Sequence, residues 1–127
     1  MSLNESGEMY LETIYILSQK KPAVHSVDIA EHMNFSKPSV SRAVGLLKNQ
    51  MHITVDKDGS ITLTESGKEL ATKIFERHNV LSDILKAIGV SDKVATEDAC
   101  RMEHVISEET FEALKRHLSQ NRNNPRR

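Results

Sequence analysis

The chain has 127 residues, of which 38% are hydrophobic and only 4% aromatic, enough for one ordinary domain or two small units that share a helix. No apolar run approaches the roughly 20 residues of a membrane-spanning helix, and no signal-peptide pattern begins the chain, so we expect a cytoplasmic protein outside any membrane. The single cysteine, Cys100, excludes an internal disulfide. The net charge of −1 hides six Lys/Arg against four Asp/Glu over residues 20–60, which is compatible with a DNA contact through this region alone.

Three helices and a hairpin are predicted in the first half of the chain. Apolar residues recur at three- and four-residue steps from residue 5 to 19, as in an amphipathic helix. Ser26 can cap a short helix over residues 27–33, and Ser36, after a tight turn, can cap a third helix. Two alternating apolar runs at residues 53–55 and 61–63 then flank a turn containing Asp58-Gly59, which is a strong hairpin signal.

Three more helices are predicted in the second half. Thr64 can cap a long helix that runs to about residue 88, with Gly89 as a left-handed stop. A shorter helix is expected over roughly residues 96–106. Ser107, followed by two glutamates, opens the last helix, and the polar residues from Gln120 onward are expected to be disordered.

Helix, tight turn, helix and β-hairpin, in this order, describe a winged helix-turn-helix whose third helix enters the DNA major groove. Arg42 is the best candidate for a bidentate contact with a guanine edge, whereas Lys37, two serine hydroxyls and Lys57 on the wing suit phosphate contacts. The predicted DNA-binding residues are Ser36, Lys37, Pro38, Ser39, Ser41, Arg42 and Lys57. The alternative is a small helical bundle with a solvated third helix, but a plain bundle has no use for the hairpin.

A second pattern suggests a metal site. Cys100, Glu103 and His104 stand at i, i+3 and i+4, so a predicted helix would present them on one face. Alone, such a triplet is more often a buried cysteine with a surface glutamate and histidine. A methionine and a glutamate on the first helix and a histidine midway along the long helix add donors, although core packing is the commoner role of methionine. The candidate metal ligands are Met9, Glu12, His78, Cys100, Glu103 and His104.

Four segments together resemble the diphtheria-toxin-repressor family of iron- and manganese-dependent regulators, and the resemblance spans about residues 5–118. They are EMYLETIY (8–15), SKPSVS (36–41), LTESGK (63–68) and ACRMEHV (99–105). The resemblance implies a mostly α protein, in which a winged helix-turn-helix is followed by an all-helical dimerisation domain, with metal bound where the two meet. We therefore expect a DNA-binding domain over residues 1–64, a dimerisation and metal-binding domain over 65–120, and a disordered tail over 121–127.

The resemblance also implies roles for single residues. The positions that match the DNA-activating site of the iron-responsive members are Met9, Cys100, Glu103 and His104. The positions that match ligands of the manganese-responsive branch are Glu12 and His78, and His78 also matches an ancillary-site ligand of the iron branch. Ser82 and Thr96 stand where that ancillary site would have a carboxylate and an imidazole, so we expect it to be weakened or rebuilt. In length the chain resembles the short manganese-type regulators.

The donor types indicate the metal. Because the thioether of Met9 and the thiolate of Cys100 are soft ligands, we expect Fe(II) first and Mn(II) second, with Co(II), Ni(II) and Zn(II) substituting in vitro; Cys100 could instead offer its backbone oxygen. The resemblance implies a metal-dependent transcriptional repressor of metal-uptake genes. Its homodimer would place two recognition helices ~34 Å apart on an inverted-repeat operator.

Two alternatives follow from the same residues. A metal-independent winged-helix regulator could sense an organic ligand. A metallopeptidase could use the Cys-x-x-Glu-His pattern, which parallels the inverted zincin motif, but so short a chain would have to build a substrate cleft as well and would leave the winged helix unexplained. No phosphate loop or nucleophile elbow is present, so we do not expect an enzyme.

Overall fold

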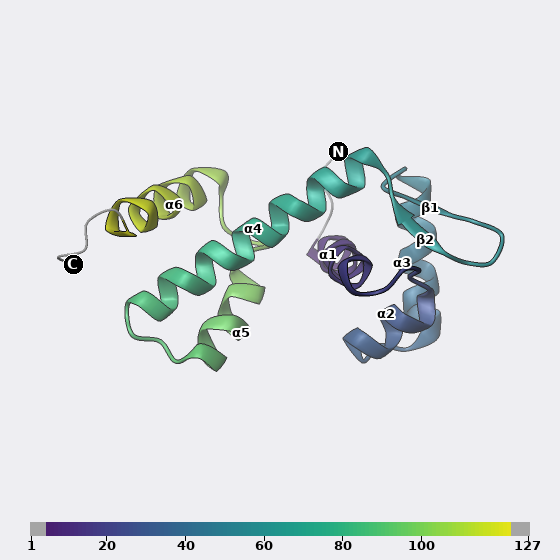
Figure 1. Ribbon diagram of the computed structural model, residues 1–127, viewed down its shortest axis with the longest axis horizontal. Helices are drawn as coiled ribbons and strands as arrows, with labels where there is room; N and C mark the ends of the chain where they lie inside the picture. Colours follow the sequence, from purple (N-terminus) through teal and green to yellow (C-terminus); the bar gives the residue numbers. More distant parts are fainter. Residues whose placement is uncertain (1–4, 123–127) are drawn as a thin grey trace. The chain divides into compact units, whose positions relative to one another are not determined.

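The computed structural model describes residues 5–122, and the chain divides into two compact units, Met1–Lys73 and Ile74–Arg127. The described elements follow one another as α1 (Glu5–Lys20), α2 (Ser26–Met33), α3 (Lys37–Asn49), β1 (Ile53–Val55), β2 (Ile61–Leu63), α4 (Glu65–Ala87), α5 (Asp92–Met102) and α6 (Glu108–Arg122) (Figure 1). Helix α4 thus begins in the first unit and continues into the second.

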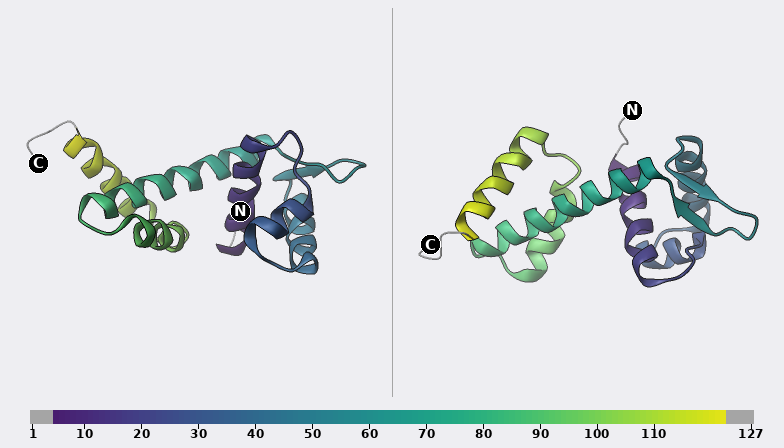
Figure 2. Two further views of the ribbon diagram at one scale, coloured as in Figure 1. Left: turned by 60° about the horizontal axis from the view of Figure 1, so that its bottom comes forward. Right: turned by 45° about the horizontal axis from the view of Figure 1, so that its top comes forward.

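The first unit has the predicted order of a winged helix-turn-helix, with α1, α2 and α3 gathered beside the β1–β2 hairpin (Figure 2). Leu11, Ile29, Val40 and Leu47, contributed by all three helices, are fully buried in one apolar core. Ser36 caps α3 as expected, since its hydroxyl accepts a hydrogen bond from the Ser39 amide at 3.3 Å.

The wing is the predicted antiparallel hairpin, in which Ile53 pairs with Leu63 and Val55 with Ile61. Gly59 adopts a φ of 84° in the connecting turn, where a residue with a Cβ would be strained. The strand is also tied to the segment before α2, because the Ile61 amide donates to the Val24 carbonyl at 2.7 Å. This bridge between Val24 and Ile61 holds the wing against the segment that leads into α2.

The start of α4 is locked onto the segment between α3 and the wing. The Met51 carbonyl accepts hydrogen bonds from the hydroxyls of Thr64 (2.7 Å) and Ser66 (3.2 Å), and Met51 itself has a left-handed φ of 66°. A Cβ on Gly67 would lie 1.9 Å from the carbonyl oxygen of His52. Only glycine therefore lets the first turn of α4 approach this backbone.

In the second unit, the bounds of α5 differ from the prediction, and the difference matters for the site. Helix α5 begins at Asp92, after Ser91 in the N-cap position, and ends at Met102, so the predicted span of residues 96–106 is wrong. The Ser91 side chain makes no capping hydrogen bond, but Asp92 places a negative charge in the first turn, which favours a helix start there. The apolar spacing used for the prediction does not register this signal. Glu103 and His104 therefore lie in the turn after α5, and the prediction that a helix presents them is wrong.

Two smaller predictions are also wrong. The N-cap of α2 is His25 rather than Ser26, which is the first helical residue, and the Asp28 carboxylate accepts the His25 amide at 2.8 Å. Residues 120–122 belong to α6 rather than to a disordered tail. The rest of the predicted tail, residues 123–127, lies outside the described residues.

Candidate metal centre and DNA-reading surface

The carboxylate of Glu103 is the centre of a polar cluster in the second unit. Its side chain is 0% exposed, and its Oε1 lies 3.3 Å from His78 Nδ1, which α4 provides. The same oxygen lies 4.0 Å from His104 Nε2, whose side chain is 1% exposed. Two imidazoles thus converge on one buried carboxylate.

The second oxygen of this carboxylate, Oε2 of Glu103, is buried and has no hydrogen-bond partner among the described residues. A buried carboxylate oxygen without a partner is costly, and native proteins rarely leave one. One carboxylate and two imidazoles form a donor set that suits divalent first-row metals. The residues present therefore fit a divalent ion.

The other predicted residues of the second unit lie differently. Cys100, in the last turn of α5, is exposed, in contrast to the buried side chains of Glu103 and His104. Ser82, one turn after His78 on α4, is buried, whereas Thr96 is exposed. The structure thus brings His78, Glu103 and His104 together, whereas Cys100 is an exposed residue.

Arg77 is a residue that the sequence reasoning missed. Its guanidinium donates to the backbone carbonyls of Glu103 (3.1 Å) and Ile106 (3.4 Å) and to the carboxylate of Glu108 (2.8 Å). It also lies over the ring of Phe111, 5.4 Å from the ring centroid. Its position next to His78 was the only available signal, because its partners lie 26 to 34 residues further along the chain.

The two candidate ligands of the first unit lie on α1. Met9 is half-buried and its carbonyl accepts a hydrogen bond from the Thr13 hydroxyl at 2.9 Å. Glu12 is buried, with 8% of its surface exposed. Glutamate is seldom buried without a partner of opposite charge or a metal, so this burial is compatible with the candidate role of Glu12 as a ligand.

The predicted DNA-reading residues lie at the surface of the first unit. Ser36, Lys37, Pro38, Ser41 and Arg42 are exposed, as is Lys57 in the wing turn, and Ser39 is half-buried. The Ser39 hydroxyl accepts from the Ser36 hydroxyl (2.9 Å) and lies 3.4 Å from Arg42 Nη2. The start of α3 therefore offers hydroxyls and a guanidinium together, as contact with phosphates and base edges requires.

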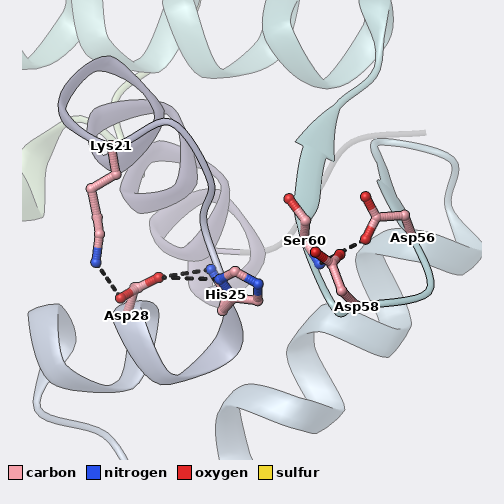
Figure 3. A network of polar contacts seen from close by, with 6 residues as sticks. All are labelled: Lys21, His25, Asp28, Asp56, Asp58 and Ser60. Carbon is pink, nitrogen blue, oxygen red and sulfur yellow. Dashed lines mark hydrogen bonds and ion pairs between the residues drawn. The ribbon is translucent and has the colours of Figure 1, made fainter.

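A polar network beside this surface holds the start of α2 and the wing turn (Figure 3). The Asp28 carboxylate is paired with the Lys21 ammonium and accepts the His25 amide. The hydrogen bond from Lys21, and then that from His25, hold the pKa of Asp28 below its ordinary value of 3.8.

In the wing turn, the carboxylates of Asp56 and Asp58 both accept the Ser60 amide, at 3.0 and 3.2 Å (Figure 3). The hydrogen bond with the Asp56 side chain, followed by that from Ser60, lowers the pKa of Asp58. These contacts stiffen the loop that displays Lys57.

Comparison with known proteins places the whole chain in one class. Residues 2–61 match the "Iron dependent repressor, N-terminal DNA binding domain" and residues 64–127 match the "Iron dependent repressor, metal binding and dimerisation domain". The diphtheria toxin repressor of Corynebacterium jeikeium is 34% identical over 97% of this chain and 52% of its own length. An uncharacterised helix-turn-helix transcriptional regulator of Methanocaldococcus jannaschii is 31% identical over 89% of this chain and 92% of its own length.

A solved structure agrees. The manganese regulator SloR superposes with a TM-score of 0.78 at 29% identity, over 94% of this chain and 55% of that one. The chain belongs to the iron-dependent repressor family, whose members are metal-dependent transcriptional regulators. It spans about half the length of the Corynebacterium repressor and of SloR. Within residues 5–122, no helix has the length and apolar character needed to cross a membrane.

Proposed function

We propose that this protein is a metal-dependent DNA-binding transcriptional repressor that works as a homodimer in the cytosol, with a divalent ion as co-repressor. The observation that carries the proposal is the buried carboxylate of Glu103. Two imidazoles lie within 4.0 Å of one of its oxygens, and the other oxygen has no hydrogen-bond partner among the described residues. A divalent ion held by Glu103 and the two imidazoles would supply positive charge next to this carboxylate.

The proposed ligands are His78, Glu103 and His104, joined by Met9 and Glu12 of α1 and by Cys100. The burial of Glu12 supports its inclusion, and the sequence resemblance supports the others. A ligand set drawn from both units would restrict α1 once the ion is bound, and the metal-free protein would lose operator affinity by a population shift. For Cys100, a Cys100→Ala variant separates the thiolate from the backbone oxygen, because alanine keeps only the latter.

The second unit is proposed to form the dimer. The support is the match of residues 64–127 to the metal binding and dimerisation domain of the family. Ile88, Val94 and Val105 are apolar residues of this unit that are exposed in the single chain, and they are candidates for that interface. Two copies related by a twofold axis would present two α3 helices to an inverted-repeat operator. Genes of metal uptake are the proposed targets.

The test begins with DNA selected from a random double-stranded library in the presence of Fe(II) without oxygen. We expect the selected sites to be inverted repeats that bind tightly with Fe(II) or Mn(II) and weakly after chelation with EDTA. Equal binding with and without EDTA would instead indicate the metal-independent regulator. Sites without twofold symmetry would contradict the dimer proposal.

Fe(II) is proposed as the physiological ion, with Mn(II) second, because Met9 adds a soft thioether to the hard carboxylates. Met9→Asp exchanges this thioether for a carboxylate and should move the ratio of the Fe(II) and Mn(II) activation midpoints toward manganese. Anaerobic titration of operator binding with each metal measures that ratio. Met9→Leu is the control for packing, and an unchanged ratio in Met9→Asp would contradict the selectivity argument.

A further inference from the structure

Arg77 stands immediately before the proposed ligand His78 on α4, and its side chain is 17% exposed. Its guanidinium reaches three acceptors, which are the carbonyls of Glu103 and Ile106 and the carboxylate of Glu108. All three acceptors belong to the turn after α5 and the first residue of α6. One side chain on α4 therefore holds the whole segment that carries Glu103 and His104.

The acceptors explain why an arginine is suited to this place. Carbonyls at the end of a helix and in the following turn lack the amide partners that a continuing helix would provide. The planar guanidinium presents five N–H groups in a fixed fork and can serve several acceptors at once, which a lysine ammonium cannot do in the same geometry. The buried ring of Phe111 beneath the guanidinium limits its movement.

We infer that Arg77 is a positioning residue of the metal centre, which sets where Glu103 and His104 lie relative to His78. The inference rests on the proposed function of these residues as ligands. The Glu103 amide still donates to the Ala99 carbonyl at 3.0 Å, as in a helix, but Glu103 and His104 lie beyond the last residue of α5. The Arg77 contacts add a second restraint on this turn, from the same turn of α4 that provides His78.

A general stabilising role is the competing explanation, and the chain offers a matched control for it. Glu76, the residue before Arg77, forms an ion pair with Lys115 at 2.6 Å, which raises the pKa of Lys115. This pair also joins α4 to α6, but it does not touch the turn at residues 103–106. Glu76→Gln therefore removes an α4–α6 contact without affecting the carbonyls that Arg77 holds.

The experiment compares Arg77→Met, Arg77→Lys, Glu108→Gln and Glu76→Gln with the wild-type chain, using Co(II) as the probe. We expect Arg77→Met to weaken Co(II) binding roughly 10- to 100-fold, as loss of an orienting partner does, and to change the Co(II) absorption spectrum. Arg77→Lys should fall between Arg77→Met and wild type. Glu108→Gln keeps both carbonyl contacts, and it should stay close to wild type together with Glu76→Gln.

A second measurement needs no metal. Hydrogen exchange of the amides of residues 103–106 in EDTA should be faster in Arg77→Met than in wild type and unchanged in Glu76→Gln. If Arg77→Met does not fold, the Arg77→Lys variant tests the inference in its place. A Co(II) affinity and absorption spectrum of Arg77→Lys equal to those of wild type would then overturn the inference.

The outcomes separate this inference from the proposed function. If His104→Ala loses Co(II) binding while Arg77→Met keeps wild-type affinity and spectrum, the positioning role is wrong and the metal centre stands. If Arg77→Met and Glu76→Gln weaken binding equally, Arg77 is only a general stabiliser and the inference is wrong. If His104→Ala binds Co(II) like wild type, the proposed centre itself is wrong.

Discussion

The two units of this chain differ in whether their proposed functional side chains are exposed or buried. The first unit surrounds an apolar core and displays its DNA-reading residues, such as Arg42 and Lys57, at the surface. The second unit buries Glu103 and the side chain of His104. Helix α1 of the first unit also buries two polar residues, Thr13 and Glu12, and Glu12 is itself a proposed ligand.

This difference follows from what each partner requires. DNA is contacted by exposed donors that are solvated in the free protein, so displaying them adds little strain to the fold. A metal ion is bound by groups already desolvated and oriented, and burying a charge without a full set of partners opposes folding. Substitution of a DNA-reading residue in the first unit should therefore change DNA binding and leave stability unchanged. Substitution of a buried ligand in the second unit should change both metal binding and stability.

The largest effect is expected from the buried cluster of the second unit. Glu103→Gln and His104→Ala should each weaken metal binding more than roughly 100-fold, beyond the loss typical of an orienting partner, and should abolish metal-dependent operator binding. In EDTA, Glu103→Gln should melt at the same or a higher temperature, because it removes a buried charge. Calorimetry with Mn(II) and thermal melts in EDTA measure both effects. A lower melting temperature in EDTA would show that the carboxylate is structural instead.

The next effect tests the rigid backbone of the first unit. Gly67→Ala would place a Cβ 1.9 Å from the His52 carbonyl oxygen, and such overpacking should lower the free energy of unfolding by about 3 kcal/mol. Gly45→Ala is the control, because Gly45 lies within α3 and a Cβ added there would meet nothing within 4 Å; it should stabilise the chain by roughly 0.5–1 kcal/mol. Urea unfolding of both variants checks this pair, and equal effects would contradict the close approach.

A smaller effect separates the two kinds of DNA contact in the first unit. Arg42→Ala should lose ~1–3 kcal/mol of discrimination between selected and scrambled DNA. Lys57→Ala should weaken binding to both and reduce the slope of the salt dependence by about 1. Competition titrations at two salt concentrations measure these quantities. Neither variant should change the melting temperature, and the reverse pattern would mean that the two roles are exchanged.

The smallest effect concerns the ion pair at the start of α2. The folded pKa of Asp28 lies below its ordinary value of 3.8, so the carboxylate stabilises the fold above that pH and loses this contribution as the pH falls through the lowered pKa. Asp28→Asn should therefore be less stable at pH 7, by no more than about 1 kcal/mol, with the difference vanishing in acid. Melts of both proteins between pH 7 and 2.5 test this, and a difference independent of pH would contradict it.

The sequence by itself determined the order of elements in the first unit. The Ser36 cap and the Asp58-Gly59 turn act through hydrogen bonds and backbone preferences within a few residues, so local patterns were sufficient to predict α3 and the wing. Residue spacing also selected Glu103 and His104 as candidates, and the resemblance to the repressor family added His78.

Only the tertiary structure decided how the second unit presents those residues. The end of α5 at Met102, the burial of Glu103 and the contacts that Arg77 of α4 makes with Glu103 and Glu108 are properties of the folded chain. Arg77 and its acceptors are 26 to 31 residues apart, and no periodicity links positions so distant. Helical spacing describes neighbours along one element, whereas burial and hydrogen bonding between elements arise only when the chain is folded.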